Sequence, residues 1–152
     1  MNQDFKELLS EFNAHHVEYL VVGAHALAVY GHLRATKDLD IWINPTETNA
    51  VNVISALQAF GAPLQDLTNN DLSTPGTVFQ MGIPPVRIDI INEISGVQFT
   101  DAWPKRFQSQ LDGQSVWVIS KSDFILNKRT SGRTQDLADI EHLENLNEDI
   151  QD

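Results

Sequence analysis

The chain has 152 residues and a mass of 17.0 kDa, which is enough for one domain with a substantial core and too little for two ordinary ones. Cysteine is absent, which excludes disulfides, thiolate metal sites and cysteine nucleophiles. The formal net charge of -11 argues against non-specific binding to DNA, because phosphate contacts need Lys and Arg.

The charges are unevenly spread along the sequence. Residues 1–104 carry 12 acidic and 4 basic side chains, residues 105–133 carry 2 and 6, and residues 134–152 carry 7 acidic side chains and no basic one. One interpretation is a solvated acidic tail beside an ordinary basic helix, and the other is a basic segment that binds an anion. No apolar run reaches the roughly 18 residues of a membrane span, and the start does not resemble a signal peptide, so we expect a soluble, cytoplasmic protein.

The first third of the sequence predicts two helices and two strands. Apolar residues at helical spacing predict an amphipathic helix over residues 3–15. The apolar run 18–22 predicts a strand that passes through Gly23 into a short helix ending at Gly31, a turn whose exposed N–H groups suit an anion. Residues 38–43 (DLDIWI) alternate polar and apolar side chains and predict the second strand.

The middle third predicts a helix, a connection and a strand pair. The helix spans residues 46–60. Its expected buried stripe consists of Val51, Ile54 and Leu57. Polar and turn residues dominate over residues 62–75, where we expect an exposed connection. A strand pair is predicted over residues 77–81 and 86–91.

The last third predicts mainly helices. Aromatic residues at four-residue steps favour a helical piece over residues 99–107, and a turn then precedes a strand over 115–119. Two helices follow, over residues 120–129 and from Thr134 onward, separated by the helix-breaking Gly132. The expected apolar stripe of the last helix consists of Leu137, Ile140, Leu143 and Leu146.

The order of these elements predicts an α+β fold, in which a small mixed β-sheet is flanked by helices. We expect a single domain over residues 1–152, with a core at about 17–119 and C-terminal helices at about 120–147. The sequence shows no internal repeat and no domain linker.

Three carboxylates stand on predicted strands at positions where an apolar side chain is usual: Asp38, Asp40 and Asp89. The first two, at i and i+2, project to one face and repel each other. A divalent cation would neutralise such a cluster, and oxygen ligands suit Mg²⁺ or Mn²⁺ rather than Zn²⁺. Two such ions can hold a nucleotide's phosphates and activate an attacking hydroxyl. The alternative is a solvent-facing strand end whose carboxylates pair with Arg34, Lys37 and Arg87.

The run from residue 19 to 43 (YLVVGAHALAVYGHLRATKDLDIWI) resembles the active-site signature of the DNA polymerase β-like nucleotidyltransferase superfamily. That signature is a strand, a Gly-Gly or Gly-Ser turn, a helix, a glycine, and then Arg-x-Thr-x-Asp-x-Asp. The matching residues here are Gly23, Gly31, Arg34, Thr36, Asp38 and Asp40, and Asp89 looks like the third carboxylate.

A second segment extends the resemblance to residues 19–143. Residues 121–143 are similar to the C-terminal helices of small bacterial nucleotidyltransferases that include the AbiEii toxin-like proteins. The residues at matching places are Lys128, Arg133, Asp136 and Asp139.

The resemblance implies a nucleotidyltransferase fold and transfer of a nucleoside monophosphate from an NTP to an acceptor hydroxyl, with release of pyrophosphate. It implies two Mg²⁺ or Mn²⁺ ions on the three carboxylates, with Asp89 also helping to deprotonate the acceptor. The implied nucleotide contacts are Gly23, Ala24, Arg34, Thr36, Lys128 and Arg133, and the supporting residues are Arg87, Asp136 and Asp139. The implied partners are an unidentified acceptor (a protein, a small molecule or a tRNA) and a cognate antitoxin.

The turn departs from the superfamily pattern, because Ala24 follows Gly23 and supplies no hydroxyl to touch a phosphate. Backbone N–H groups could still bind the phosphate. Two alternatives therefore stay open: a non-catalytic module that binds a nucleotide or a partner and keeps the fold, and a structural α+β domain whose aspartates are solvated.

Overall fold

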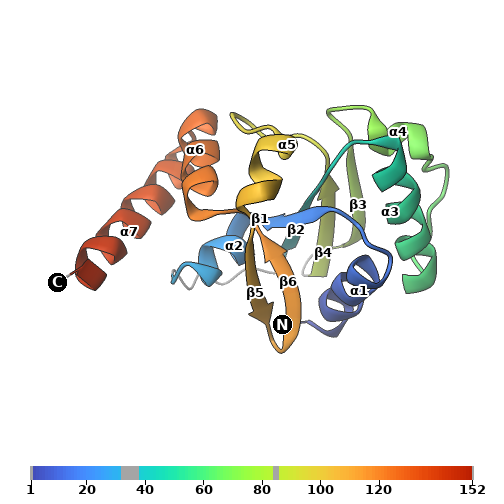
Figure 1. Ribbon diagram of the computed structural model, residues 1–152, viewed down its shortest axis with the longest axis horizontal. Coiled ribbons are helices and arrows are strands. Elements are labelled where there is room, and N and C mark those ends of the chain that lie inside the picture. Colours follow the sequence, from blue (N-terminus) through green and yellow to red (C-terminus); the bar gives the residue numbers. More distant parts are fainter. Residues whose placement is uncertain (1, 32–37, 84–85, 152) are drawn as a thin grey trace.

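Figure 1 shows the computed structural model, which describes residues 2–31, 38–83 and 86–151. The strands are β1 (Tyr19–Val22), β2 (Asp38–Ile43), β3 (Val78–Ile83), β4 (Val86–Ile91), β5 (Phe107–Leu111) and β6 (Gln114–Val118). The helices are α1 (Gln3–Ala14), α2 (Gly23–Val29), α3 (Glu47–Phe60), α4 (Asn69–Ser73), α5 (Phe99–Ala102), the 3₁₀ turn η1 (Trp103–Lys105), α6 (Lys121–Ser131) and α7 (Thr134–Gln151).

The six strands form one mixed sheet in the order β3-β4-β2-β1-β6-β5. Strand β1 is antiparallel to β2 and parallel to β6, and β2 is parallel to β4. The outer pairs β3–β4 and β5–β6 are antiparallel. The predicted α+β fold with a small mixed sheet is therefore confirmed.

Helices gather at both ends of the sheet. In Figure 1, α1, α3 and α4 lie at one end of the molecule, and α2, α6 and α7 lie at the other. The apolar face of α1 is buried as its spacing predicts. Trp42 of β2 is 1% exposed and packs edge-on against Phe99 of α5, with ring centroids 5.0 Å apart. No helix within the described ranges is both long and apolar enough to cross a membrane.

The buried stripe of α3 matches the prediction only in part, because Leu57 is buried and Ile54 packs partly buried against the core, but Val51 does not. Val51 is 47% exposed, and the buried residues are Asn49, Ala50, Val53, Ala56 and Leu57. The helix is turned so that its small residues and Asn49 face inward. The Asn49 side chain accepts a hydrogen bond from the Glu18 amide and donates to the Glu18 and Asn44 carbonyls, which links α3 to the ends of two strands.

The segment 62–75 is more ordered than the expected exposed connection. It contains α4, which begins with a capping box in which the Thr68 and Asp71 side chains bond each other's backbone N–H groups. Leu72 is 1% exposed. The Asn92 side chain donates to the carbonyls of Leu72 and Thr74, so α4 is fastened to the end of β4.

The predicted helix over 99–107 is only partly correct. The helical turns end at Lys105, and Phe107 begins β5 opposite Val118. Pro104 cannot continue an α-helical ladder because it lacks an N–H. Arg106 then stacks between Trp103 and Trp117, with its guanidinium carbon 4.0 and 4.3 Å from the two ring centroids.

The buried stripe of α7 also differs from the prediction. Leu137 is 51% exposed, whereas Ile140 and Leu143 are buried as expected. Asp136 and Asp139 are each only 2% exposed. The side chain of Leu146 lies outside the described part of the structure. The helix thus turns two carboxylates inward, an arrangement that needs compensating partners.

Candidate functional site

Strands β2 and β4 bring the three predicted carboxylates to one face of the sheet. The parallel register pairs Asp40 with Asp89 and Asp38 with Arg87. Alternate residues of a strand share a face, so all four side chains project to the same side. Asp89 is 8% exposed, and Asp38 lies nearer the solvent with a side chain that is 39% exposed. The predicted shared face is therefore confirmed.

Asp40 lies in the crowded centre of this group. Burial, together with the charges of Asp89 and Asp38, raises its pKa to about 6 against the opposing effect of Lys128 and Arg87. Gly23 makes this position possible. Its φ is +68°, and a Cβ there would collide with Oδ2 of Asp40. The turn from β1 into α2 therefore needs glycine for both its backbone conformation and its closeness to the carboxylate.

Arg87 bridges the two outer carboxylates. Its Nη2 lies 3.2 Å from Oδ2 of Asp38 and donates to Oδ2 of Asp89, also at 3.2 Å. Its Nε is 3.1 Å from Oδ1 of Asp89, but neither atom completes a well-aligned hydrogen bond. Lys37 and Arg34, the other predicted partners, lie outside the described residues.

The carboxylates suit a hard divalent cation in donor type but do not yet converge on one point. Within residues 2–31, 38–83 and 86–151, no group of three or more Asp, Glu or His side chains is arranged to hold a metal ion as it stands. The raised pKa of Asp40 and the unbonded Oδ1 of Asp89 nevertheless indicate negative charge that Arg87 compensates only in part. Carboxylate oxygens are the donor type that Mg²⁺ and Mn²⁺ prefer.

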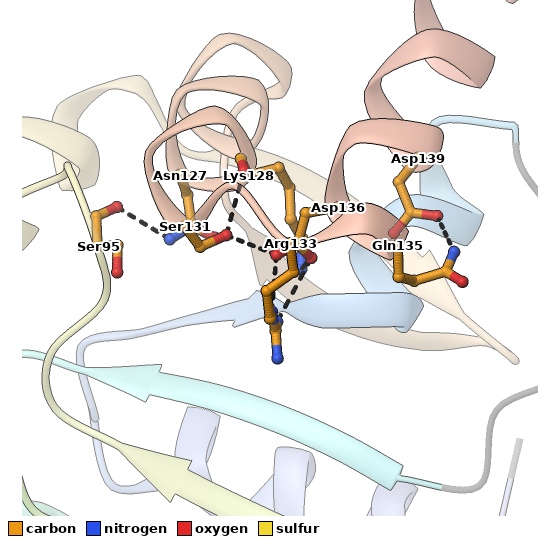
Figure 2. Close-up of polar contacts among 8 residues, drawn as sticks. All are labelled: Ser95, Asn127, Lys128, Ser131, Arg133, Gln135, Asp136 and Asp139. Carbon is orange, nitrogen blue, oxygen red and sulfur yellow. Dashed lines mark hydrogen bonds and ion pairs between the residues drawn. The ribbon is translucent and has the colours of Figure 1, made fainter.

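Positive charge comes from the hairpin of α6 and α7. Helix α6 is capped by Ser120 and ends at Gly132 in the left-handed conformation, so α7 folds back against it. Figure 2 shows Lys128, Ser131 and Arg133 around the buried Asp136. Lys128 Nζ lies 3.3 Å from Oδ1, while Arg133 Nε and Ser131 Oγ donate to Oδ2 at 2.8 and 2.6 Å.

Asp136 is the centre of this cationic cluster. Burial by itself would raise its pKa, but the hydrogen bonds from Arg133 and Ser131 and the charge of Lys128 lower it to about 2. Lys128 is 12% exposed and Arg133 is 75% exposed at the side chain. Asp136 therefore pairs with both a largely buried lysine and an accessible arginine.

Two adjoining pockets, here called the site pockets, lie between Asp40 and the cations Lys128 and Arg133, whereas Asp89 and Arg87 line neither of them. Both are lined by Gly23, Asp40, Lys128 and Arg133. The first, of about 340 Å³, is completed by Val22, Ile91, Ile94, Ser95, Asn127 and Ser131. The second, of about 310 Å³, is completed by Ala24, Asp38, Gln135 and Asp136. Residues more than 80 positions apart in sequence thus face the same cavities.

A larger pocket of about 450 Å³ lies elsewhere, lined by Trp103 and Trp117 among others. Its lining includes none of the three carboxylates. We place the candidate site at the two smaller pockets because Asp40 lines both of them together with Lys128 and Arg133.

Several predicted site residues do not meet the others in the described structure. Asp139 accepts a hydrogen bond from Gln135 at 2.8 Å, lies beside the Asp136 cluster in Figure 2, and does not line the site pockets. Arg34 and Thr36 fall outside the described residues, so their predicted nucleotide contacts stay predictions.

Sequence reasoning missed four polar residues that line the pockets: Ser95, Asn127, Ser131 and Gln135. Ser131 lies three residues after Lys128 and four after Asn127 on α6, and residues three or four apart on a helix are neighbours. That spacing from the predicted Lys128 could have indicated Ser131. Asn127 Nδ2 also donates to the Ser95 carbonyl at 2.9 Å, which fixes α6 to the loop after β4 (Figure 2).

The fold is that of nucleotidyltransferases. Lincosamide antibiotic adenylyltransferase LnuA, solved with lincomycin bound, is similar with a TM-score of 0.60 and 18% identity, over 95% of this chain and 96% of that one. A putative nucleotidyltransferase from Thermotoga maritima has a TM-score of 0.56 and 14% identity, over 97% of this chain and 90% of that one. An antigenic nucleotidyltransferase-like protein from Paracoccidioides brasiliensis has a TM-score of 0.54 and 16% identity, over 93% of this chain and 73% of that one.

The chain belongs to the family described as nucleotidyltransferase of unknown function (DUF6036), whose sequence profile matches residues 1–150. This membership confirms the predicted class of protein. Comparison with curated proteins finds no match. The relation to the AbiEii-like proteins stays a prediction.

Proposed function

We propose that this protein is a metal-dependent nucleotidyltransferase that moves a nucleoside monophosphate from an NTP to an acceptor hydroxyl. One observation carries the proposal. The carboxylate Asp40 and the cations Lys128 and Arg133 line the same two pockets, next to Asp38 and Asp89. Membership of a nucleotidyltransferase family supports this function.

The three carboxylates are the residues that would hold Mg²⁺ or Mn²⁺, two ions in the proposed site. When bound, such ions supply charge neutralisation for the phosphates and the leaving pyrophosphate. Asp40 is central because the register places it beside Asp89 and two residues along the strand from Asp38. Gly23 keeps the space around its carboxylate open.

Side chains of this protein then have separate roles in the proposed reaction. Asp89 accepts the proton of the acceptor hydroxyl, and the acceptor oxygen forms a bond to the α-phosphorus of the NTP. The bond from that phosphorus to the β-phosphate bridging oxygen breaks, and pyrophosphate leaves with the electron pair. Lys128 supplies a point charge to the triphosphate, and Arg133 can bind two of its oxygens at once.

The test combines purified protein, Mg²⁺ and labelled NTPs with a lysate as the source of acceptors. We expect pyrophosphate release and a labelled product with the wild type and neither with Asp40→Asn. Arg129→Gln, a change at an exposed ion pair with Glu144 on the α6–α7 hairpin, serves as the control that keeps activity. Absence of NTP binding, pyrophosphate and labelled product in the wild type would refute the proposal.

The acceptor is a small molecule, a protein or a tRNA, and the charge distribution favours the first two. LnuA is described as an adenylyltransferase of lincosamide antibiotics, so hydroxyl-bearing small molecules are the first acceptors to screen. The acidic sequence outside residues 105–133 disfavours a long RNA. We also propose a cytoplasmic location, because NTPs are available there.

Ala24 favours a second candidate, a non-catalytic module that binds a nucleotide or a partner. Ala24 is 8% exposed and offers no hydroxyl to the second site pocket. Calorimetry that shows NTP binding, together with no pyrophosphate release under any acceptor condition, would select this candidate. Restoration of activity by Ala24→Ser would assign the defect to the missing hydroxyl.

We also propose that the protein acts as the toxin of a toxin–antitoxin pair, as the predicted relation to AbiEii-like proteins implies. Expression in a bacterial host should then arrest growth, and Asp40→Asn should relieve the arrest. Equal growth of cells that express the two forms would remove this role and leave the chemistry intact.

A further inference from the structure

Arg87 occupies a position between two of the proposed metal ligands. Its Nη2 is 3.2 Å from Oδ2 of Asp38 and 3.2 Å from Oδ2 of Asp89, and its Nε is 3.1 Å from Oδ1 of Asp89. One planar guanidinium therefore faces three carboxylate oxygens. This arrangement follows from the register, because Arg87 lies opposite Asp38 and two residues before Asp89.

A guanidinium and a divalent cation compete for these oxygens. Mg²⁺ requires carboxylate oxygens at about 2.0–2.1 Å in near-octahedral geometry, and its charge repels a neighbouring cation. The oxygens that Arg87 contacts belong to two of the three proposed ligands. The repulsion between the two cations would therefore weaken the contacts of the guanidinium with these carboxylates and favour its displacement.

Arg87 is also free to leave these contacts. The side chain is 32% exposed, and its geometry to the buried Asp89 is imperfect, since Nε and Oδ1 form no aligned hydrogen bond. Its cross-strand neighbour on β3 is Gly82, so no side chain from that register position confines the guanidinium. A purely structural arginine in a closed network would be held more completely.

We propose that Arg87 is an internal competitor for the divalent cation, holding Asp38 and Asp89 until the ion displaces it. This inference rests on the proposed metal-dependent function. It assigns to Arg87 a positioning role: the guanidinium keeps the two carboxylates facing each other without strong repulsion, and it lowers the affinity for a cation that arrives alone. A cation that arrives with a nucleotide gains the contacts of Lys128 and Arg133 and displaces Arg87 more readily.

The test is calorimetric titration of the full chain with Mn²⁺ in the absence of nucleotide. We expect Arg87→Gln to bind Mn²⁺ roughly 3- to 30-fold more tightly than the wild type, the range expected from losing one competing charge-assisted contact. Arg87→Lys keeps the charge but loses the planar two-oxygen contact, so its affinity should lie between the two. Arg129→Gln is the matched arginine control and should bind as the wild type does.

Thermal unfolding gives a second readout that a merely structural arginine would not produce. Without added cation, Arg87→Gln should unfold at a lower temperature than the wild type. Saturating Mn²⁺ should raise its unfolding temperature by more than it raises that of the wild type. If Arg87 had a structural role alone, Arg87→Gln would lower the unfolding temperature by the same amount with and without Mn²⁺. If Arg87→Gln fails to fold, the comparison with Arg87→Lys decides.

Two outcomes would overturn the inference, and they are distinguishable. Equal or weaker Mn²⁺ affinity in the folded Arg87 variants would remove the competition while the metal site stands. Absence of Mn²⁺ binding in the wild type and in every folded variant would remove the proposed metal site, and the inference with it.

Discussion

Gly23 shows how one missing side chain shapes the candidate site. Its left-handed backbone turns the chain from β1 into α2, and a Cβ there would collide with Oδ2 of Asp40. Gly113 offers a matched comparison, because its φ is +83° and a Cβ there would meet nothing within 4 Å. Alanine at either position would pay the cost of a left-handed backbone, but only at Gly23 would its Cβ also collide with another side chain.

We therefore expect Gly23→Ala to lower the free energy of unfolding by about 2–4 kcal/mol, and Gly113→Ala by only about 1 kcal/mol. Chemical denaturation measures both values. Mn²⁺ titration of Gly23→Ala should show lost or strongly weakened binding, because Asp40 has to move. Equal destabilisation by the two substitutions would contradict the proposed collision.

Asp40 gives a pH prediction whose sign is fixed by its environment. Its pKa is raised to about 6 in the fold, against about 3.9 in an unfolded chain, so the folded protein binds this proton more tightly. The stabilising effect of the bound proton is fully present below pH 4 and is lost as the pH rises through 6. Above that pH the ionised, buried carboxylate destabilises the fold.

Asp40→Asn should consequently be more stable than the wild type at pH 8 by about 1–3 kcal/mol, and equal to it near pH 4. Denaturation at a series of pH values in EDTA checks this difference. Asp66→Asn, at an exposed position, controls for the change in net charge. A constant difference between Asp40→Asn and the wild type at all pH values would argue against burial as the cause.

At the scale of elements, the α6–α7 hairpin depends on one buried carboxylate. Asp136 accepts hydrogen bonds from Ser131 and Arg133 and pairs with Lys128. Because its pKa is lowered to about 2, its stabilising contribution is present above pH 4 and disappears as the pH falls through 2.

Asp136→Asn should lower the free energy of unfolding at pH 7 by about 1–3 kcal/mol. The range is kept low because the arginine partner of this buried carboxylate is mostly exposed, and solvent screens the pair. NTP affinity should fall about tenfold, because Lys128 and Arg133 lose the group that positions them. Calorimetry with an NTP analogue measures this loss. Asp139→Asn, at a position equally buried on the same helix, should retain most of the affinity; an equal loss would show that α7 acts as a whole.

The elements also show what the sequence can and cannot predict. Helix α6 was predictable because Ser120 and Gly132 are local signals at its ends, and β2 was predictable because its residues alternate. Strand β5 was not, because its sequence (FQSQL) has exposed or half-exposed side chains and is defined by pairing with β6. Local patterns fix capping and periodicity, whereas pairing depends on a distant partner.

The same distinction applies to the site. The carboxylates were predictable because an aspartate on a strand breaks an apolar pattern. The inward position of Asp136 was not, because hydrophobic spacing points to Leu137, which is 51% exposed. Asp136 can face inward because Lys128 and Ser131 of α6, together with Arg133, compensate its charge, and that information lies in the packing of α6 on α7.

At the scale of the whole molecule, the net charge of -11 limits the partners. Duplex DNA should not bind at physiological salt, because the basic side chains are too few and are concentrated in one segment. An NTP with Mg²⁺ should bind, because the ions offset the carboxylates. At a free concentration of about 100 times its Kd, the complex should stabilise the fold by about 2.7 kcal/mol.

Fluorescence anisotropy with labelled DNA and thermal unfolding with Mg²⁺–NTP check the two halves of this prediction. EDTA is the control for the nucleotide, and it should remove most of the stabilisation. Tight DNA binding, or nucleotide stabilisation that EDTA does not change, would show that net charge and carboxylates do not govern ligand choice here.

The central position of β1 has a consequence for how the site is assembled during synthesis. The carboxylates lie on strands that precede residue 92, whereas Lys128 and Arg133 follow β6, which joins the sheet beside β1 through Val21 and Val118. A growing chain therefore presents the three carboxylates before Lys128 and Arg133 have been synthesised. The pairing of β6 with β1, extended by the Ile119 amide that donates to the Val21 carbonyl, is what brings those two cations to the carboxylates.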